Sequence, residues 1–143
     1  MSRLFERQRG DLWGLLWLAL GIVLALSLAS YSPLDPSLNS LTIIGKPQNL
    51  CGYIGSFLSD IFYQCFGLTS WLLVVVALRR AVSRFSGFKT EPAKKRWIVE
   101  GLLLLGLACL FSLHMQETRF FSGSIRVGGW LGYVLVRQFL PLL

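Results

Sequence analysis

The fold is decided by residues 52–78, GYIGSFLSDIFYQCFGLTSWLLVVVAL. Polar and apolar residues recur at helical spacing up to Phe66, which predicts an amphipathic helix. Residues 67–78 carry no charge, but a helix of this length is about 18 Å long, too short to cross a hydrocarbon core of ~30 Å. We therefore expect one long tilted helix that includes residues from Ile61 onward in the span. Its polar outer end, with Asp60, is expected to emerge among head groups or against protein.

Composition predicts an all-α membrane protein, a helical bundle of three to four transmembrane helices. Apolar residues make up 54% of the chain and charged residues only 15%, whereas a soluble domain of this size needs far more polar surface. The net charge of +7 permits nucleic-acid binding, but the basic residues flank apolar runs. We therefore favour cytoplasmic membrane flanks over direct contact with DNA. Ten of the fourteen lysines and arginines lie in two such clusters: Arg3, Arg7, Arg9, Arg79, Arg80, Arg84, Lys89, Lys94, Lys95 and Arg96.

The other helices and loops follow from the same distribution. Residues 12–30 form an uncharged run long enough to span a bilayer; a signal peptide is the competing interpretation, but the run is longer than is usual for one. Residues 97–113 form a third apolar run. Turn residues and few cations place loops 31–51 and 114–126 outside, whereas the basic loop 79–96 belongs in the cytoplasm with the N-terminus.

The last segment, residues 127–143, repeats the pattern of the central stretch. Both contain GxxGxxLx followed by a charged residue, and each follows an apolar helix and an outer polar loop. The chain, a single membrane-anchor domain over 1–143, is thus predicted to hold two parallel copies of helix, outer loop, GxxG half-helix and inner helix. In that case the inner half of the fourth helix begins just past Leu143, and the chain is a fragment. The aligned segments are GYIGSFLSDIF, residues 52–62, and GWLGYVLVRQF, residues 129–139.

Three charged residues lie within these helical runs. The repeat places Asp60 and Arg137 at equal depth near the outer interface, where each can snorkel to the head groups or the two can pair between helices. For Glu100 we prefer an interfacial pairing with basic residues 94–96 over a proton-relay role. Close helix approach at the GxxG glycines would help a charge pair between the second and fourth helices. These glycines are Gly52, Gly55, Gly129 and Gly132.

The sequence contains no pattern for catalysis, for cofactor binding or for metal binding. It has no GxxxxGK[ST] phosphate loop, no Ser/His/Asp or Cys/His arrangement and no paired carboxylates. The single histidine, His114, has no neighbouring His or Cys, and the three cysteines lack metal-ligand spacing. We therefore assign no catalytic, cofactor-binding or metal-binding residue, and we expect that this segment is not an enzyme.

Five short segments follow one another in a recognisable order. They are SYSPLDPS at 30–37, NLCGYIG at 49–55, LSD at 58–60, FG at 66–67 and GGWLG at 128–132. This order resembles the N-terminal four-helix transmembrane domain of the FtsK/SpoIIIE family of bacterial DNA translocases. The resemblance covers most of the chain, and it departs from the family pattern at Leu38, Ser59 and Arg137.

The resemblance implies the membrane anchor of a septum-localised DNA translocase that acts in cell division and chromosome segregation. Such an anchor tethers a C-terminal ATP-driven DNA pump and scaffolds the division machinery. The motor is absent from this chain, so ATP, Mg and DNA would be bound only by that missing part. The implied partners are the lipid bilayer, other division-machinery membrane proteins and further copies in a homo-oligomer. The implied location is the bacterial cytoplasmic (inner) membrane at the septum, multi-pass, with the N-terminus in the cytoplasm.

Two alternatives remain open at this point. The first outer loop contains proline-fixed turns and a family-like SxxPxDPS sequence, more than a simple connector requires, so Pro33, Asp35 and Pro36 are candidate interaction residues. The alternative is that the two prolines only end the first helix. The rival function is a small helical transporter or channel subunit. It is supported only by the parallel repeat and by the three charges within helical runs.

Overall fold

The computed structural model describes residues 2–37, 46–86, 93–115, 118–121 and 123–139, with only the backbone described for 2–9 and 93. This part of the chain contains five α-helices, one 3-10 helix and a two-stranded hairpin. The elements are α1 (Ser2–Ala29), α2 (Gly52–Phe66), the 3-10 helix η1 (Gly67–Ser70), α3 (Trp71–Phe85), α4 (Ala93–His114), β1 (Arg119–Phe120), β2 (Ile125–Arg126) and α5 (Gly129–Phe139).

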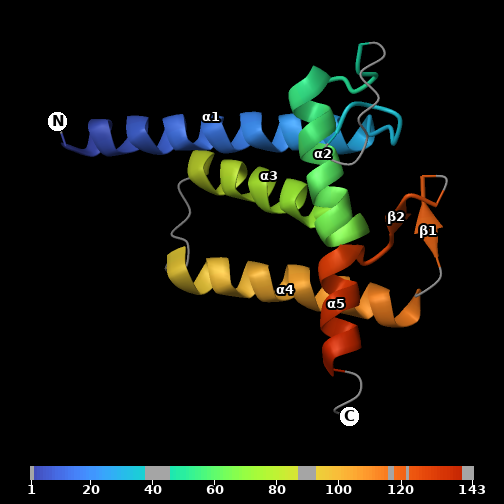
Figure 1. Cartoon of the computed structure of the whole chain (residues 1–143). Helices are drawn as coiled ribbons and strands as arrows, with labels where there is room; N and C mark the ends of the chain where they lie inside the picture. Colours follow the sequence, from blue (N-terminus) through green and yellow to red (C-terminus); the bar gives the residue numbers. More distant parts are fainter. Residues whose placement is uncertain (1, 38–45, 87–92, 116–117, 122, 140–143) are drawn as a thin grey trace.

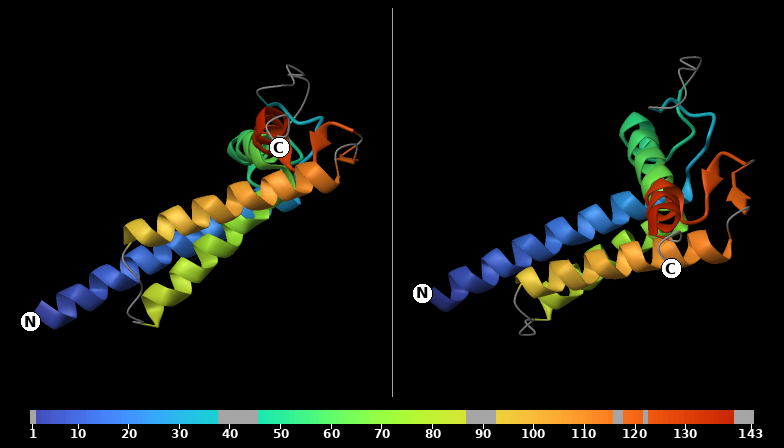
Figure 2. Two further views of the ribbon diagram at one scale, coloured as in Figure 1. Left: turned by 90° about the horizontal axis from the view of Figure 1, so that it is seen from below. Right: turned by 60° about the horizontal axis from the view of Figure 1, so that its bottom comes forward.

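Three long helices run along one axis, and two shorter helices cross them near one end. α1, α3 and α4 lie lengthwise, with α3 antiparallel to the other two, whereas α2 and α5 run across them (Figure 1). α2, α5 and the β1–β2 pair gather at one end of the bundle in every view (Figure 2). We call this the hairpin end. The opposite end, where α3 finishes and α4 begins, we call the basic end.

Three helical segments are long and apolar enough to cross a bilayer: Gly10–Ala29, Gly52–Phe85 and Lys94–His114. Only 28%, 33% and 17% of their most apolar windows are buried within the protein. Apolar side chains such as Leu20 and Leu102 are therefore left on the outside of the bundle. These side chains are suited to contact with lipid, because a continuous apolar surface of this kind is unfavourable in water. The structure confirms an all-α membrane protein.

The expectation of one continuous helix over 52–78 was wrong. α2 ends at Phe66, and the chain turns through η1 so that α2 lies across the bundle while α3 runs along it (Figure 1). The additional length that the span requires comes from its C-terminal end, because α3 continues through Arg79 and Arg80 to Phe85. η1 and α3 together are about 30 Å long, which matches the ~30 Å thickness of the hydrocarbon core.

Other boundaries also differ from the sequence-based ones. α1 begins at Ser2, before the apolar run 12–30, and α4 extends beyond 97–113 at both ends. Hydropathy detects only the lipid-compatible part of a helix, whereas backbone hydrogen bonding continues into polar flanks. The loop 114–126 contains the hairpin, in which β1 pairs antiparallel with β2.

α5 in the second half of the chain is equivalent in position to α2 in the first half. Gly52 and Gly129, which the sequence alignment pairs, both begin their helices with a positive φ, 63° and 68°. Both helices cross the bundle at the hairpin end (Figure 1). In its described part, the expected fourth helix over 127–143 is therefore the crossing helix α5, Gly129–Phe139.

The corner at Gly67 packs backbone to backbone against the start of α5. Gly67 has a φ of 60°, a conformation that is costly for any residue with a Cβ. A Cβ there would lie 2.6 Å from the Arg126 carbonyl oxygen and 2.6 Å from the Gly129 nitrogen. Beside it, the Leu68 N–H donates to the Val127 carbonyl over 2.9 Å. The corner therefore joins α2 and α3 to the hairpin and to α5.

Small residues set the spacing of α1 and α3. A Cβ on Gly21 would lie 2.8 Å from Leu78 Cδ2, and one on Gly14 would lie 2.9 Å from Phe85 Cε1. Such close approach replaces the hydrophobic driving force that is absent between helices in lipid. A small core closes the hairpin end, and α1 contributes two of its residues. The core residues are Leu24, Leu28, Tyr63, Val74 and Ile125.

We expect Gly67→Ala to destabilise the protein. The substitution places alanine in the left-handed region, at a cost of about 1–2 kcal/mol, and presses its Cβ against backbone that cannot move aside. Thermal unfolding in detergent micelles should show a lowered Tm. The matched control is Gly106→Ala, where nothing lies within 4 Å of an added Cβ, and its Tm should be unchanged or slightly raised. Equal melting of the two variants would contradict the role of the corner.

Candidate functional site

In the described residues, no three His, Cys, Asp or Glu side chains come together as a metal site requires. Polar side chains gather instead in two networks. One connects loops 31–51 and 114–126 to α1 and α2 at the hairpin end, and the other joins α1, α3 and α4 at the basic end. These two networks are the candidate sites of the protein.

Asp35 closes the loop 31–51 on itself. Its carboxylate accepts hydrogen bonds from the N–H groups of Gln48, at 2.8 Å, and Asn49, at 2.9 Å. The side chain is buried, and Pro33 and Pro36 beside it are half-buried. All three predicted loop residues therefore shape the loop, and their part in binding a partner stays a prediction.

Asn49 connects the loop to two helices. Its Nδ2 donates to the Ser27 carbonyl at 2.8 Å and to Ser59 Oγ at 3.4 Å, and its Oδ1 accepts from the Cys51 N–H at 3.0 Å. It thereby satisfies backbone groups left free at the end of α1 and before α2. Sequence analysis missed this role. The available signal was a short amide side chain directly before a helix start, where such residues bond to free backbone groups.

Asp60 is buried at the hairpin end, with 3% of its surface exposed. The Tyr31 hydroxyl donates to its Oδ1 at 3.1 Å, and Gln64 Nε2 donates to both oxygens at 2.9 Å. A buried carboxylate requires such donors. Burial, together with this carboxylate, raises the pKa of Tyr31 well above its ordinary value. The phenol therefore stays protonated and remains a donor.

Three aromatic rings link loop 31–51 to loop 114–126. The Tyr31 ring centroid lies 5.1 Å from that of Tyr63 and 4.9 Å from that of Phe121, a residue next to β1. The Tyr63 hydroxyl donates to the Leu28 carbonyl at 3.1 Å and accepts from Trp71 Nε1 at 3.0 Å. The cluster thus connects α1, α2 and α3 to the second loop.

Asp60 and Arg137 are not brought together. Arg137 is exposed and donates to the Tyr133 hydroxyl at 3.0 Å within α5. No ion pair between Asp60 and Arg137 occurs in the described part of the chain. Asp60 does not snorkel to the head groups either, because it is buried among its own donors.

The remaining predicted packing glycines serve other contacts. A Cβ on Gly55 would lie 2.9 Å from Asn49 Cγ, and one on Gly132 would lie 2.7 Å from Ser112 Oγ. Gly55 therefore makes room for the loop, and Gly132 lets α5 approach α4 closely. The second glycine of each GxxG motif thus packs its crossing helix against its own half of the chain, whereas Gly129 lies against the Gly67 corner of the first half.

Arg80 is buried at the basic end, with 6% of its surface exposed. Its guanidinium carbon lies 3.4 Å from the Trp97 ring centroid and 4.6 Å from that of Trp17. It also forms an ion pair with Glu100. Aromatic faces and a carboxylate thus replace the water that a buried guanidinium loses. Sequence analysis missed this residue because it took Arg79 and Arg80 as the end of the span.

Glu100 pairs across helices and not within its own turn. Its two oxygens bind Arg79 and Arg80 of α3, whereas residues 94–96 were the expected partners. The buried Arg80 has the greater need of a counter-charge, because it has little contact with water. This pairing accounts for Glu100 without a proton-relay role.

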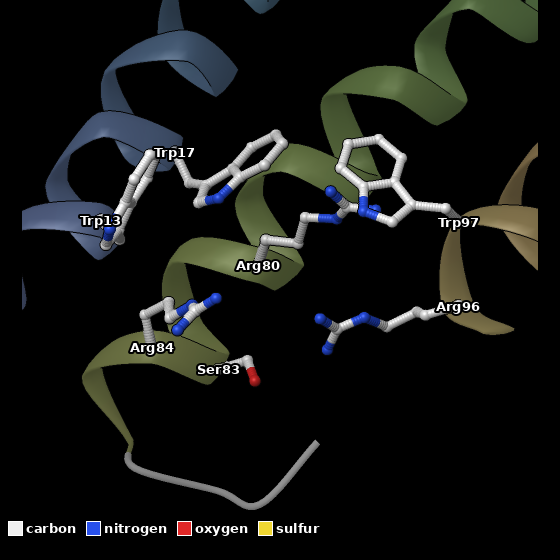
Figure 3. Close-up of a pocket in the computed structure, with 7 residues that line it drawn as sticks. All are labelled: Trp13, Trp17, Arg80, Ser83, Arg84, Arg96 and Trp97. Atoms are coloured by element: carbon white, nitrogen blue, oxygen red, sulfur yellow. The ribbon is translucent and has the colours of Figure 1, made fainter. Parts of the chain in front are cut away.

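A cavity of about 200 Å³ lies beside Arg80 at the basic end. Arg84 and Arg96 extend toward one another from α3 and α4, and Trp13 and Trp17 form the α1 side (Figure 3). The lining is thus made chiefly of guanidinium groups and indole rings. Its arginines and tryptophans are Arg80, Arg84, Arg96, Trp13, Trp17 and Trp97.

Double-mutant cycles test the network around Asp60. We expect Asp60→Asn and Arg137→Gln to be additive in the free energy of unfolding within ~0.5 kcal/mol, because the side chains do not meet. Asp60→Asn and Tyr31→Phe should instead couple by at least ~0.5 kcal/mol. Denaturant unfolding in micelles measures both cycles. Coupling in the first cycle together with additivity in the second would overturn this assignment.

The chain was compared with known protein families and structures. Residues 6–143 match the family described as the 4TM region of DNA translocase FtsK/SpoIIIE. No solved structure matches the chain.

Curated relatives that share this sequence are named DNA translocase FtsK. The Pasteurella multocida protein is 30% identical over 132 residues, 86% of this chain and 13% of the relative. The Caulobacter vibrioides protein is 34% identical over 97 residues, 64% of this chain and 12% of the relative. The Rickettsia prowazekii protein is 46% identical over 59 residues, 41% of this chain and 8% of the relative. The chain thus spans only a small part of these relatives, and, since the family match covers nearly all of its residues, it belongs to the FtsK/SpoIIIE family as that family's four-transmembrane region.

Proposed function

We propose that the chain anchors a septum-localised DNA translocase in the bacterial cytoplasmic membrane and helps to assemble the division machinery. The observation that carries the proposal is the family match over residues 6–143, in a chain with three membrane-spanning segments. The relatives are named DNA translocases, and the chain spans 8% to 13% of the three described above. ATP, Mg and DNA would then be bound by a motor outside this segment.

The basic end is proposed to face the cytoplasm. Ten of the fourteen lysines and arginines lie in segments 1–11 and 79–96, which meet at this end. Short basic flanks are retained on the cytoplasmic side during insertion. The hairpin end, with loops 31–51 and 114–126, then faces outward.

The hairpin end offers a surface for division-machinery membrane proteins. Hydrogen bonds to Asp35 and from Asn49 hold the loop, while apolar residues project from it: Leu34 is 77% exposed and Leu50 is 71% exposed. Loop residues that are held in place beside exposed apolar side chains suit a protein interface. Assembly into a homo-oligomer remains a prediction.

No observation favours a transporter or channel subunit. Asp60 is engaged by Tyr31 and Gln64, Glu100 is engaged by two arginines, and Arg137 lies on the surface. The charges that suggested transport therefore have contacts that explain them.

Cysteine labelling tests the orientation. In a variant whose three native cysteines are replaced by serine, Lys46→Cys should react with a membrane-impermeant maleimide on intact spheroplasts. Ser86→Cys should react only after lysis. Both positions are exposed in the structure, so a reversed pattern would overturn the orientation and could not be ascribed to burial.

A paired substitution tests the outer surface. Leu34→Ser/Leu50→Ser in the full-length translocase should reduce midcell localisation of a fluorescent fusion and lengthen the cells, with the Tm of the purified chain unchanged. Removal of the whole loop 31–51 would be less informative, because it also deletes Asp35 and Asn49. Lys46→Ser in the same loop is the control and should localise normally. Normal division with the paired substitution would remove the proposed contact.

A further inference from the structure

The cavity at the basic end has more positive charge than the neighbouring described residues neutralise. Glu100 is already bound by Arg79 and Arg80. Among the residues that the structure describes, no carboxylate lies within ion-pair distance of Arg84 or Arg96. Their guanidinium groups nevertheless extend toward one another across the cavity (Figure 3). Like charges that approach one another repel, and an anion between them removes that repulsion.

Two donors at this cavity are buried without an acceptor. The Nε atoms of Arg80 and Arg96 are shielded from water, and neither has a hydrogen-bond partner within the described residues. Arg80 itself is 94% buried, since 6% of it is exposed. Unsatisfied buried donors are rare and costly in native proteins. Both observations point to a missing acceptor of negative charge.

The cavity lies at head-group depth. Trp13 and Arg96 lie within the first turn of the spans that begin at Gly10 and Lys94, and Arg84 lies next to the end of the span at Phe85. Tryptophans at such positions mark the membrane–water interface. The phosphates of a phospholipid leaflet are therefore at the same level as the guanidinium groups.

We propose that this cavity binds a phosphate group, supplied by the head group of an anionic phospholipid or by free phosphate. Arg84 and Arg96 would bind its oxygens from two sides, with planar donor pairs that match phosphate geometry. Ser83 lines the same cavity and adds a hydroxyl donor. A volume of about 200 Å³ accommodates a phosphate but not a whole lipid, so glycerol and acyl chains would leave along the indole rings. Basic pockets between membrane helices bind anionic head groups in this way.

The inference requires only the membrane location and not the proposed anchoring of a motor. Loss of phosphate binding would therefore leave the proposed function intact. Loss of septal localisation would equally leave the phosphate site intact.

Tryptophan fluorescence tests the site directly, because three of the five tryptophans of the chain line the cavity. The 143-residue chain in detergent micelles is titrated with dihexanoyl-phosphatidylglycerol, with dihexanoyl-phosphatidylcholine and with inorganic phosphate. We expect a saturable change with phosphatidylglycerol. Phosphatidylcholine should bind at least about tenfold more weakly, because its choline brings a cation into a cationic cavity. If inorganic phosphate saturates the signal at the same concentration as phosphatidylglycerol, the phosphate site stands and its ligand is the soluble anion.

Two double variants with the same charge change decide whether the signal comes from this cavity. Arg84→Gln/Arg96→Gln should weaken phosphatidylglycerol binding by at least about tenfold, since each charged hydrogen bond contributes substantially. Neither residue is fully buried, so the variant should fold with an unchanged Tm. Arg119→Gln/Arg137→Gln removes two exposed arginines at the hairpin end and should bind as the original chain does. Equal binding by both variants, or no saturable response to phosphatidylglycerol or phosphate, would overturn the proposal.

Discussion

The contact between the Gly67 corner and the start of α5 is the constraint on which the rest of the structure depends. A positive φ at Gly67 turns the chain from α2, which crosses the bundle, into α3, which runs along it. The missing side chain also lets the backbone of Gly129 lie directly against the corner. Backbone packed on backbone leaves little freedom for either half to move. The corner therefore sets where α3 enters the bundle and where α5 begins.

The two halves of the chain meet at this corner, but the glycines that the repeat aligns make different contacts. Gly52 and Gly129 start equivalent helices with the same backbone conformation. Gly55 then makes room for the Asn49 side chain of the preceding loop, whereas Gly132 of α5 packs against Ser112 of α4. The repeat therefore preserves the backbone geometry of each helix start while the side-chain contacts have diverged.

The two ends of the bundle stabilise their buried charged side chains with different kinds of partner. At the hairpin end, neutral hydroxyl and amide donors surround Asp60 and connect loop 31–51 to α1. At the basic end, Glu100 and two indole rings hold Arg80. Leaving any of these groups without its partners would be costly at the edge of a bilayer. The described residues of loop 31–51 are thus held by buried hydrogen bonds at the hairpin end, whereas the opposite end is cationic.

Hydropathy and charge by themselves determined the helical membrane class and the approximate spans, and the repeated GxxG motif determined the pairing of Gly52 with Gly129, because these depend on residue order alone. The tertiary structure alone decided that 52–78 bends, since one left-handed φ at Gly67 leaves no hydropathy signal. It also decided that Arg80 is buried and that Asp60 and Arg137 lie apart. A charge at the end of an apolar run has the same hydropathy whether water or a tryptophan surrounds it. The packing of α1 and α4 against α3 places two indole rings and a carboxylate around Arg80. These contacts offset the free-energy cost of burying its guanidinium group.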